Sequence, residues 1–414
     1  MREVVAGWML ILAVVVPCAL GQKAPDATPA SSSSLGLLLA YVSGQRHPEG
    51  IDIPSSVRYK TLLIVSDASG VRIVATLPDV IVPRKTGFWR VGIEHTCQLA
   101  PAGLYDERDH GAVKTQDIAY AVPVDKPPIV EVQYPPCDSD TAKRVADDSY
   151  IAWPSDRSSY NECGGLHLWF KSVLPDLISI SASEVDLCLR RGGHSYAERW
   201  VQNPENPMAP FFETWHVDSI PSNTKIRFDH LFGPVGHDAW VRAVSPLQDA
   251  AGEACQQDDP SVMQQTGWNL EHGQGQWRTA AYVNVDGSCE GIGHPEISVP
   301  RSLTHAISLP IPWSALEKQL SGISDAYFSP TGSVVLAVKS EPGPASNESH
   351  VTSVGLFDFS GGKISRKLLD LPSGDIVRAE WSTGRIVKDW TEALTALQTR
   401  GLSAPVVKLK SEPK

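Results

Sequence analysis

Short apolar runs alternate with turn-forming residues along most of this chain. Runs of four to eight residues rich in Val, Ile, Leu and aromatics, bounded by Gly, Pro, Asn or Ser, are typical of β-strands. Glycine in the intervening turns adopts positive φ at little cost, so the chain can reverse within a few residues. Three hairpins are predicted on this pattern: Thr61–Val65 with Val71–Ala75, Trp268–Glu271 with Trp277–Val285, and Val354–Phe359 with Ile364–Leu369.

Helical patterns are scarce by comparison. Pro312–Leu320 is predicted to form two turns, because proline is favoured at the first helical position and Gly322 follows. Asp389–Arg400 is the better candidate, with Asp389 and Glu392 at capping-box spacing and Gly401 placed to end the helix. Its apolar face holds Trp390, Leu394 and Leu397, and we expect that face to pack on a sheet. The stretch 203–261 is rich in Pro, Asn and Asp and is expected to contain long loops.

One segment carries a more specific signal. Phe328-Ser329-Pro330-Thr331-Gly332 ends one apolar run, and the run Val334–Val338 follows it. This pattern resembles the Phe-Ser-Pro-Asp-Gly strand-turn-strand signature of TolB-like and WD40-like β-propellers, with Thr331 in place of the aspartate. The resemblance extends over about residues 323–390 and implies blade repeats of roughly 40 to 50 residues.

The predicted fold class is therefore all-β. The resemblance implies a β-propeller of about six to eight blades over residues 36–402, with a short C-terminal helix. The alternative is a pair of β-sandwich-like domains joined near residue 150, which would produce the same short strands and turns.

The two ends of the chain differ in character from this body. Residues 1–21 contain the apolar run Trp8–Val16 and then small residues at Ala19 and Gly21, the pattern of a cleaved signal peptide. That run is too short to span a bilayer, so no transmembrane segment is expected and the mature protein is predicted to be secreted or periplasmic. Residues 22–35 are predicted to be a flexible linker and residues 403–414 a disordered tail.

Charge limits the class of partner. The formal net charge is -11, with both signs scattered along the chain. Nucleic-acid binding needs clustered Lys and Arg to displace counterions from phosphate, so a nucleic-acid partner is not expected. A protein or a glycan partner remains open, and the sequence does not assign an oligomeric state.

Cysteine number agrees with export. Seven cysteines become six once residues 1–21 are removed, and an even number outside the cytoplasm favours disulfides. Nearest-neighbour pairing is the preferred arrangement among the 15 possible ones. It would join Cys97 to Cys137, Cys163 to Cys188, and Cys255 to Cys289. Because the chain has no Cys-x-x-Cys and no zinc-like Cys/His spacing, no metal site is assigned.

The sharpest catalytic motif is Gly193-His194-Ser195-Tyr196-Ala197, which is similar to the nucleophile elbow of serine hydrolases except at Ala197. A triad would also need an acid and a histidine, for example from Asp229 and His230 or from Asp238 and His237. The hydrolase fold requires crossover helices that this sequence does not predict, so a β-turn at Arg190–Gly193 is preferred.

Other polar motifs favour ordinary surface roles. The pairs Glu271-His272, His237-Asp238 and His294-Pro295-Glu296 are isolated, and their spacing fits surface hydrogen bonding as well as metal ligation. Asp138-Ser139-Asp140 lacks the rest of a calcium loop, and Asn347-Glu348-Ser349 matches a glycosylation acceptor. Tryptophans within predicted strands are expected to fill cores, and those near loops are the candidates for a ligand platform: Trp153, Trp215, Trp240 and Trp313.

These observations favour an exported, non-catalytic binding or scaffold module for a protein or glycan, without a cofactor. The competing hypothesis is an extracellular hydrolase or lyase acting on carbohydrate, with acidic residues drawn from separate loops. No catalytic or ligand-binding residue is assigned from the sequence.

Overall fold

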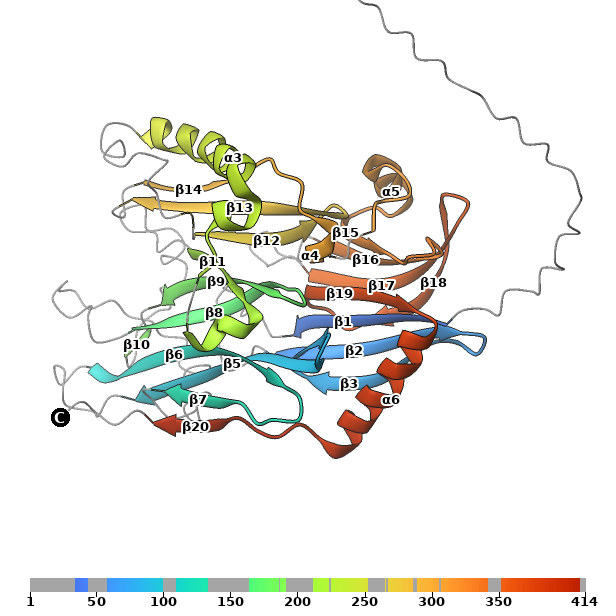
Figure 1. The fold of residues 1–414 in the computed structure, drawn as a ribbon, viewed down its shortest axis with the longest axis horizontal. Helices are drawn as coiled ribbons and strands as arrows, with labels where there is room; N and C mark the ends of the chain where they lie inside the picture. Colours follow the sequence, from blue (N-terminus) through green and yellow to red (C-terminus); the bar gives the residue numbers. More distant parts are fainter. Residues whose placement is uncertain are drawn as a thin grey trace, which may run out of the picture. The chain divides into compact units, whose positions relative to one another are not determined.

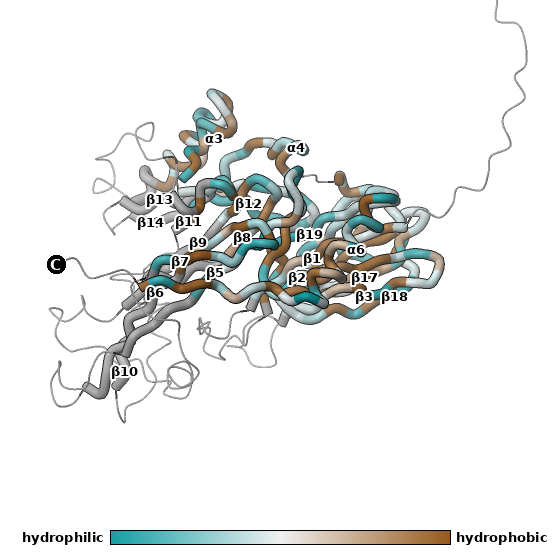
Figure 2. Tube along the Cα trace, turned by 60° about the horizontal axis from the view of Figure 1, so that its bottom comes forward, coloured by the Kyte–Doolittle hydropathy of each residue, from teal (hydrophilic) through white to brown (hydrophobic). Residues whose placement is uncertain are grey.

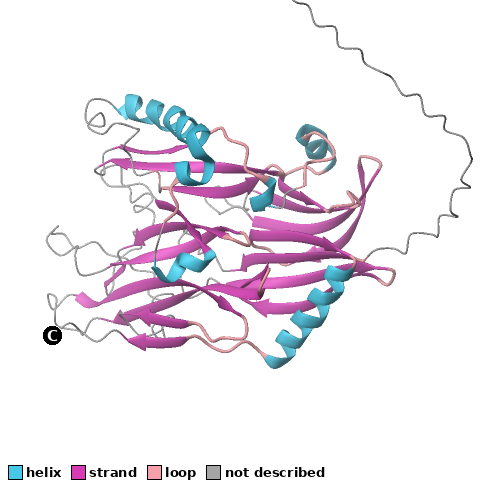
Figure 3. Ribbon diagram, in the orientation of Figure 1, coloured by secondary structure: helices cyan, strands magenta, loops and turns pink. Residues whose placement is uncertain are grey.

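The fold was analysed in a computed structural model of the chain. It describes residues 34–43, 58–99, 109–132, 164–185, 187–190, 211–222, 225–251, 265, 267–285, 289–304, 307–341 and 351–409. Strands dominate these residues and are grouped into several small, mainly antiparallel sheets (Figures 1 and 3). The prediction of a mainly β protein is therefore confirmed.

Two four-stranded sheets contain the predicted hairpins nearest the chain ends. Sheet I has the order β19-β1-β2-β3 and sheet IV has the order β15-β16-β17-β18. The strands of sheet I are β1 (Leu35–Ser43), β2 (Arg58–Asp67), β3 (Gly70–Pro78) and β19 (Asp375–Thr383). Those of sheet IV are β15 (Ile323–Phe328), β16 (Val334–Glu341), β17 (Val351–Ser360) and β18 (Lys363–Leu371).

The predicted turn after Phe328 is present in sheet IV. The hydroxyl of Ser329 accepts hydrogen bonds from the backbone N–H groups of Ser333 and Val334. Gly332 adopts φ 64°, a left-handed conformation that favours glycine. The motif thus works as a local strand-turn-strand unit joining β15 to β16.

Sheets I and IV pack face to face, and each is covered on its other face by a helix. Alternation along β1 sends Leu37 and Leu39 toward Leu336 and Leu356 of sheet IV. It sends Leu38 to the opposite face, against helix α6 (Arg385–Arg400). The outer face of sheet IV, which includes Phe328 and Phe357, packs on helix α5 (Trp313–Gln319). The layer order is α6, sheet I, sheet IV, α5, and the apolar stretches can be followed along the trace in Figure 2.

Helix α6 confirms one sequence prediction and corrects another. Trp390, Leu394 and Leu397 are buried together against sheet I, as their spacing predicts. The helix begins at Arg385, however, and its N-cap is Gly384 with no side-chain cap. Asp389 therefore lies inside the helix, and its capping-box spacing with Glu392 is coincidental. Gly401 ends the helix as predicted, with its N–H bonded to the carbonyl of Leu397.

The seven-stranded sheet II follows sheet I along the chain. Its order is β11-β9-β8-β6-β5-β4, with β10 paired to β6. The strands are β4 (Val80–Arg84), β5 (Gly87–Leu99), β6 (Asp109–Pro123), β8 (Gly164–Val173), β9 (Leu177–Val185), β10 (Leu187–Arg190) and β11 (Phe211–His216).

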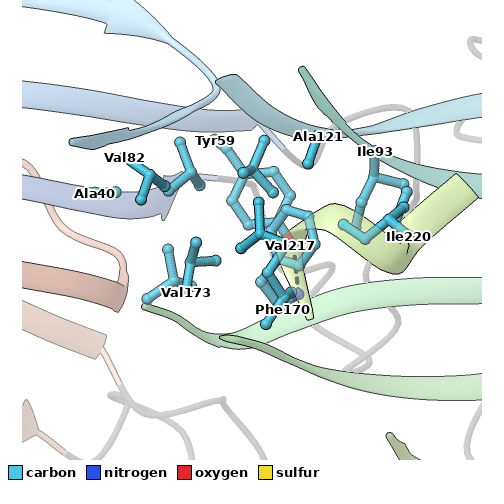
Figure 4. Close-up of a cluster of buried hydrophobic side chains, with 14 of the residues drawn as sticks. Ala40, Tyr59, Val82, Ile93, Ala121, Phe170, Val173, Val217 and Ile220 are labelled. Atoms are coloured by element: carbon cyan, nitrogen blue, oxygen red, sulfur yellow. Dashed lines mark hydrogen bonds between the residues drawn. The ribbon is translucent and has the colours of Figure 1, made fainter. Parts of the chain in front are cut away.

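Strands from both ends of sheet II contribute to one apolar cluster. Val82 of β4 and Trp215 of β11 belong to this cluster, and the 3₁₀ helix η3 (Val217–Ser222) adds Val217. Tyr59 of sheet I enters the same cluster, and its hydroxyl accepts a hydrogen bond of 3.0 Å from the N–H of Phe170 (Figure 4). Sheets I and II therefore share a core.

The three-stranded sheet III packs on sheet II together with a long helix. Its strands are β12 (Trp268–Gly273), β13 (Gln276–Val285) and β14 (Cys289–Gly293). Helix α3 (Phe228–Ala251) buries Phe228, Trp240 and Val244 against Trp268. A short helix, α4 (Arg301–Thr304), follows β14.

Helix α3 lies in the stretch for which long loops were predicted, and that prediction is wrong for the residues the helix occupies. Gly233 breaks the helix at φ 67°, ψ -159°, and Pro234 follows the break. Proline suits the first turn of a helix, so Gly233-Pro234 ends one helical segment and begins the next rather than marking a loop. None of the helices in the described ranges has the length and apolar character that crossing a membrane requires.

The C-terminal segment that follows α6 forms a strand. Residues 403–414 were predicted to be a disordered tail, yet β20 (Val406–Leu409) pairs in parallel with β7 (Ile129–Val132). We call residues 402–409 the strap, and β7 with β20 the ribbon. Residues 410–414 lie outside the described residues.

Candidate functional site

The buried polar groups of the described residues concentrate where sheet III meets sheets II and IV. The first group is a row of hydroxyls under the free edge of β12. The hydroxyl of Ser172 donates to the carbonyl of Leu270 at 2.7 Å, and the hydroxyl of Thr214 donates to the carbonyl of Trp268 at 2.9 Å. Ser179 accepts from the N–H of Leu270 at 2.9 Å. An edge strand carries unpaired backbone groups, and here three side chains of sheet II satisfy them.

The second group joins sheet III to sheet IV through one carboxylate. Oδ2 of Asp325, on β15, lies 2.7 Å from Nδ1 of His272, on β12. Its other oxygen accepts hydrogen bonds from the N–H groups of Gly275 at 2.9 Å and Ala326 at 2.8 Å. The side chains of His272 and Asp325 are only 8% and 12% exposed. This is an ordered, largely dehydrated contact between residues 53 positions apart.

Aromatic rings enclose the same contact. The imidazole of His272 stacks on Tyr327 with centroids 4.0 Å apart and packs edge-on against Trp277 at 5.1 Å. Burial raises the pKa of the Tyr327 phenol well above its ordinary value, and the negative charge of Asp325 raises it further. Tyr327 is therefore a neutral phenol at physiological pH. The arrangement fixes the orientation and the tautomer of the imidazole, as carboxylates do for histidines in enzymes.

Alternation along β12 explains why this contact was not foreseen. Adjacent residues of a strand point to opposite faces, so Glu271 and His272 cannot act together. Oε1 of Glu271 instead accepts from Nε of Arg278 at 2.9 Å and lies 3.9 Å from Nδ1 of His294. This contact lies near the surface, since the side chains of Arg278 and His294 are 55% and 56% exposed. The His272 side chain, by contrast, is buried, at 8% exposed.

The residues proposed to complete a serine triad make other contacts. Asp229 forms a two-pronged contact with the guanidinium of Arg227, which lowers the pKa of the Asp229 carboxyl. Nδ1 of His237 lies 2.8 Å from the amide of Gln265, and the oxygen of that amide accepts from the N–H of Asp229. The motif Gly193–Ala197 lies outside the described residues.

Three arginines make further charged contacts between elements of the described residues. Arg84 of β4 binds both carboxylate oxygens of Asp218 in η3, at 2.6 and 3.0 Å, and this lowers the pKa of Asp218. Arg90 of β5 contacts the carboxylate of Asp79 and the carbonyl of Ser403 in the strap.

Arg378 of β19 is the most deeply buried of the three. It donates to the carbonyl of Val173 at 2.8 Å and pairs with Glu380. Burial lowers the pKa of Arg378 to about 9, so the guanidinium still carries its charge at neutral pH. Each of these arginines links elements that are distant in sequence.

Most described tryptophans pack inside the protein. Trp268 and Trp240 are buried in one cluster, and Trp215 is buried in the core of sheet II, so neither Trp215 nor Trp240 forms an exposed platform. Trp313 is half-buried and donates from its indole N–H to Glu317 at 2.8 Å. Trp153 lies outside the described residues.

The disulfide prediction falls largely outside the described residues. On the backbone, Cys97 lies opposite Thr115, Cys188 opposite Ala112, and Cys289 opposite Val285. Their proposed partners Cys137, Cys163 and Cys255 lie outside the described residues, as do Asp138–Asp140 and Asn347–Ser349. The three pairings therefore stay predictions.

Comparison with known proteins does not assign a family. The chain matches no family model, and no curated protein sequence matches it. The function has to be argued from the contacts above.

Proposed function

We propose that this protein is an exported, non-catalytic binding or scaffold module for a protein or glycan partner. Support comes from how its buried charges are used. Asp325, Arg90 and Arg378 each bond to groups of this chain on other elements. A buried charge whose bonding capacity is used within the fold stabilises one arrangement of elements and is poorly placed to bind a reacting group.

The observation that carries the proposal is the coordination of Asp325. Its carboxylate accepts two backbone N–H groups and contacts one imidazole, and all three donors belong to this chain. The most enzyme-like pair in the described residues therefore holds two sheets together. A rigid body of packed sheets that presents loops is the ordinary architecture of binding domains.

The layer order bears on which β architecture this body has. In a propeller, the faces of each blade are covered by its two neighbouring blades. Sheet I here has sheet IV on one face and α6 on the other, and sheet IV has α5 on its outer face. We infer the second of the two expected architectures, β-sandwich-like units, with the first unit formed by sheets I and IV. Its boundary differs from the one expected near residue 150, because both chain ends contribute to it.

Export remains part of the proposal. It rests on the signal-like residues 1–21 and on six further cysteines, which would form structural disulfides outside the cytoplasm. Expression of the full chain with a C-terminal tag, followed by N-terminal sequencing of the material outside the cytoplasm, tests this step. We expect the mature chain to begin at Gln22.

Binding is tested by applying the purified mature protein to a glycan array and by proximity labelling of its extracytoplasmic neighbours. A panel of glycoside, ester and peptide substrates is assayed with the same preparation. Saturable binding without turnover is the expected result. Turnover of any substrate that disappears in the His272→Ala variant would contradict a non-catalytic role.

The contact between His272 and Asp325 also supports the competing hypothesis, that the protein is an enzyme. An imidazole oriented by a carboxylate is the arrangement that general-base catalysis uses, and an extracellular hydrolase or lyase acting on carbohydrate could use it. The two hypotheses differ in the His272→Gln variant. A structural role predicts lower stability with unchanged ligand affinity, and a catalytic role predicts loss of turnover at unchanged stability.

A further inference from the structure

Leu402, the first residue of the strap, packs against the cluster between α6 and sheet I, and the rest of the strap makes few contacts. The carbonyl of Ser403 accepts from Arg90, and the N–H of Val406 donates to the carbonyl of Pro128 at 2.7 Å. Beyond these, β20 pairs with β7 over four residues in parallel. Val407 packs in a small cluster with Val130 and Tyr120, which are 2% and 6% exposed.

These contacts make the ribbon a low-stability element. A two-stranded sheet is marginally stable by itself, and parallel pairing is slightly weaker per residue than antiparallel pairing. The ribbon joins no larger sheet within the described residues. Three of its apolar residues are exposed: Ile129 at 60%, Val406 at 45% and Leu409 at 62%. Segments of this kind open without unfolding the rest of a protein.

The residues opposite β20 define what β7 can accept. Val407 lies opposite Val130 and points into the cluster with Tyr120. Lys408 lies opposite Glu131, so a positive side chain faces a negative one in register. Strand addition takes its affinity from backbone hydrogen bonds and its specificity from alternate side chains. The matching sequence is therefore two apolar residues, a basic residue and an apolar residue.

We propose that β7 is a strand-acceptor site, that the chain's own β20 occupies it as an autoinhibitory contact, and that an extended partner segment of this apolar-basic pattern displaces β20. The proposal deepens the binding function proposed above. Its test uses the chain's own strand sequence as the probe, so it succeeds or fails independently of the glycan array and the labelling experiment.

The test measures, by fluorescence anisotropy, the affinity of the full mature chain for a labelled peptide with the sequence of residues 402–412. Val407→Asp places a charge against Val130 and Tyr120 and releases the strap. We expect this variant to bind the peptide at least tenfold more tightly than the unmodified chain. Val406→Asp is the matched control, because Val406 points outward, and it should bind like the unmodified chain.

Exchanging the charges at positions 131 and 408 distinguishes strand pairing from nonspecific binding of the peptide. Glu131→Lys in the Val407→Asp chain should weaken binding of this peptide about two- to fivefold, and a peptide carrying Lys408→Glu should restore it. Equal affinity of the Val407→Asp and unmodified chains, or binding that ignores Glu131→Lys, would overturn the proposal.

Hydrogen exchange on the unmodified chain covers the case in which the Val407→Asp chain does not fold. The amides of β20 should exchange at least tenfold faster than those of β5. Exchange of β20 only together with β5, by global unfolding, would overturn the proposal.

Discussion

At the scale of single residues, one carboxylate connects two sheets that the sequence gives no reason to join. Asp325 lies near the start of the strand that ends in the recognised turn motif. His272 belongs to a pair whose spacing fits surface hydrogen bonding as well as metal ligation. Alternation along β12 predicts that Glu271 and His272 face apart. Which of the two is buried depends on where sheet IV lies, and no local pattern contains that information.

We predict that Asp325→Asn lowers the free energy of unfolding by about 2 to 3 kcal/mol, since it replaces a charge-assisted contact to His272 with a neutral amide. Urea unfolding followed by tryptophan fluorescence measures the change. Asp370→Asn is the matched control, because this exposed residue pairs with Lys367 at the surface, and it should cost less than about 0.5 kcal/mol. Equal effects of the two substitutions would show that the contact between Asp325 and His272 contributes nothing to the free energy of unfolding.

We predict that the contribution of Asp218 to stability disappears in acid. Arg84 lowers the pKa of Asp218 in the folded protein. In the unfolded chain the pKa of this carboxyl is about 3.9, so the ionised form is favoured more strongly in the folded state. The resulting stability is present above that value and is lost as pH falls through the lower, folded pKa.

The measurement compares urea midpoints of the unmodified chain and Asp218→Asn at pH 7 and at pH values below about 4. The variant should be the less stable protein at pH 7, by under about 1 kcal/mol because Asp218 is largely exposed, and the gap should narrow in acid. A gap that stays constant or widens as pH falls contradicts the ion pair.

At the scale of elements, local signals predicted what local contacts determine. The three hairpins and the turn after Phe328 were found because their strands pair with their immediate neighbours. Helix α3 was missed because Gly233, Pro234 and Gly236 resemble a loop, whereas its burial depends on Trp268, far along the chain. Burial in the tertiary structure outweighed the local propensity of these residues.

We predict that Thr214→Val lowers the free energy of unfolding by about 1 to 3 kcal/mol, because it leaves the buried carbonyl of Trp268 without its donor. Chemical denaturation measures the loss. Thr76→Val gives a matched comparison on an exposed strand position and should change stability by under about 0.5 kcal/mol. If both variants unfold at the same denaturant concentration, the hydroxyl row does not support β12.

We predict that Leu394→Ala costs about 2 to 5 kcal/mol, since Leu394 is fully buried between α6 and sheet I. Thermal or urea unfolding reports the change. Lys388→Ala on the exposed face of the same helix should have little effect. A small effect of Leu394→Ala would mean that α6 is not a layer of the fold.

At the scale of the whole molecule, the arrangement of sheets lies beyond local pattern. Sheet I pairs Leu37 with Trp381, at opposite ends of the chain, so its composition depends on long-range pairing. Short strands with glycine turns are compatible with a propeller and with sandwiches alike. The expectation of a propeller came from one turn motif. That motif specifies a hairpin, and it does not specify what covers the faces of the hairpin.

This arrangement also bears on the proposed binding function. The strap leaves α6 at Gly401, contacts Arg90 of sheet II and ends on β7. Release of β20 would leave this core intact, because the layers α6, sheet I, sheet IV and α5 do not include β20.

The most direct test of this account is native-state hydrogen exchange of the full chain over increasing, sub-denaturing urea. We expect β1–β3 and β15–β19 to lose protection together as one cooperative unit, although almost 250 residues separate them. Loss of protection by β15–β18 together with β12–β14, while β1–β3 stay protected, would contradict this arrangement of sheets.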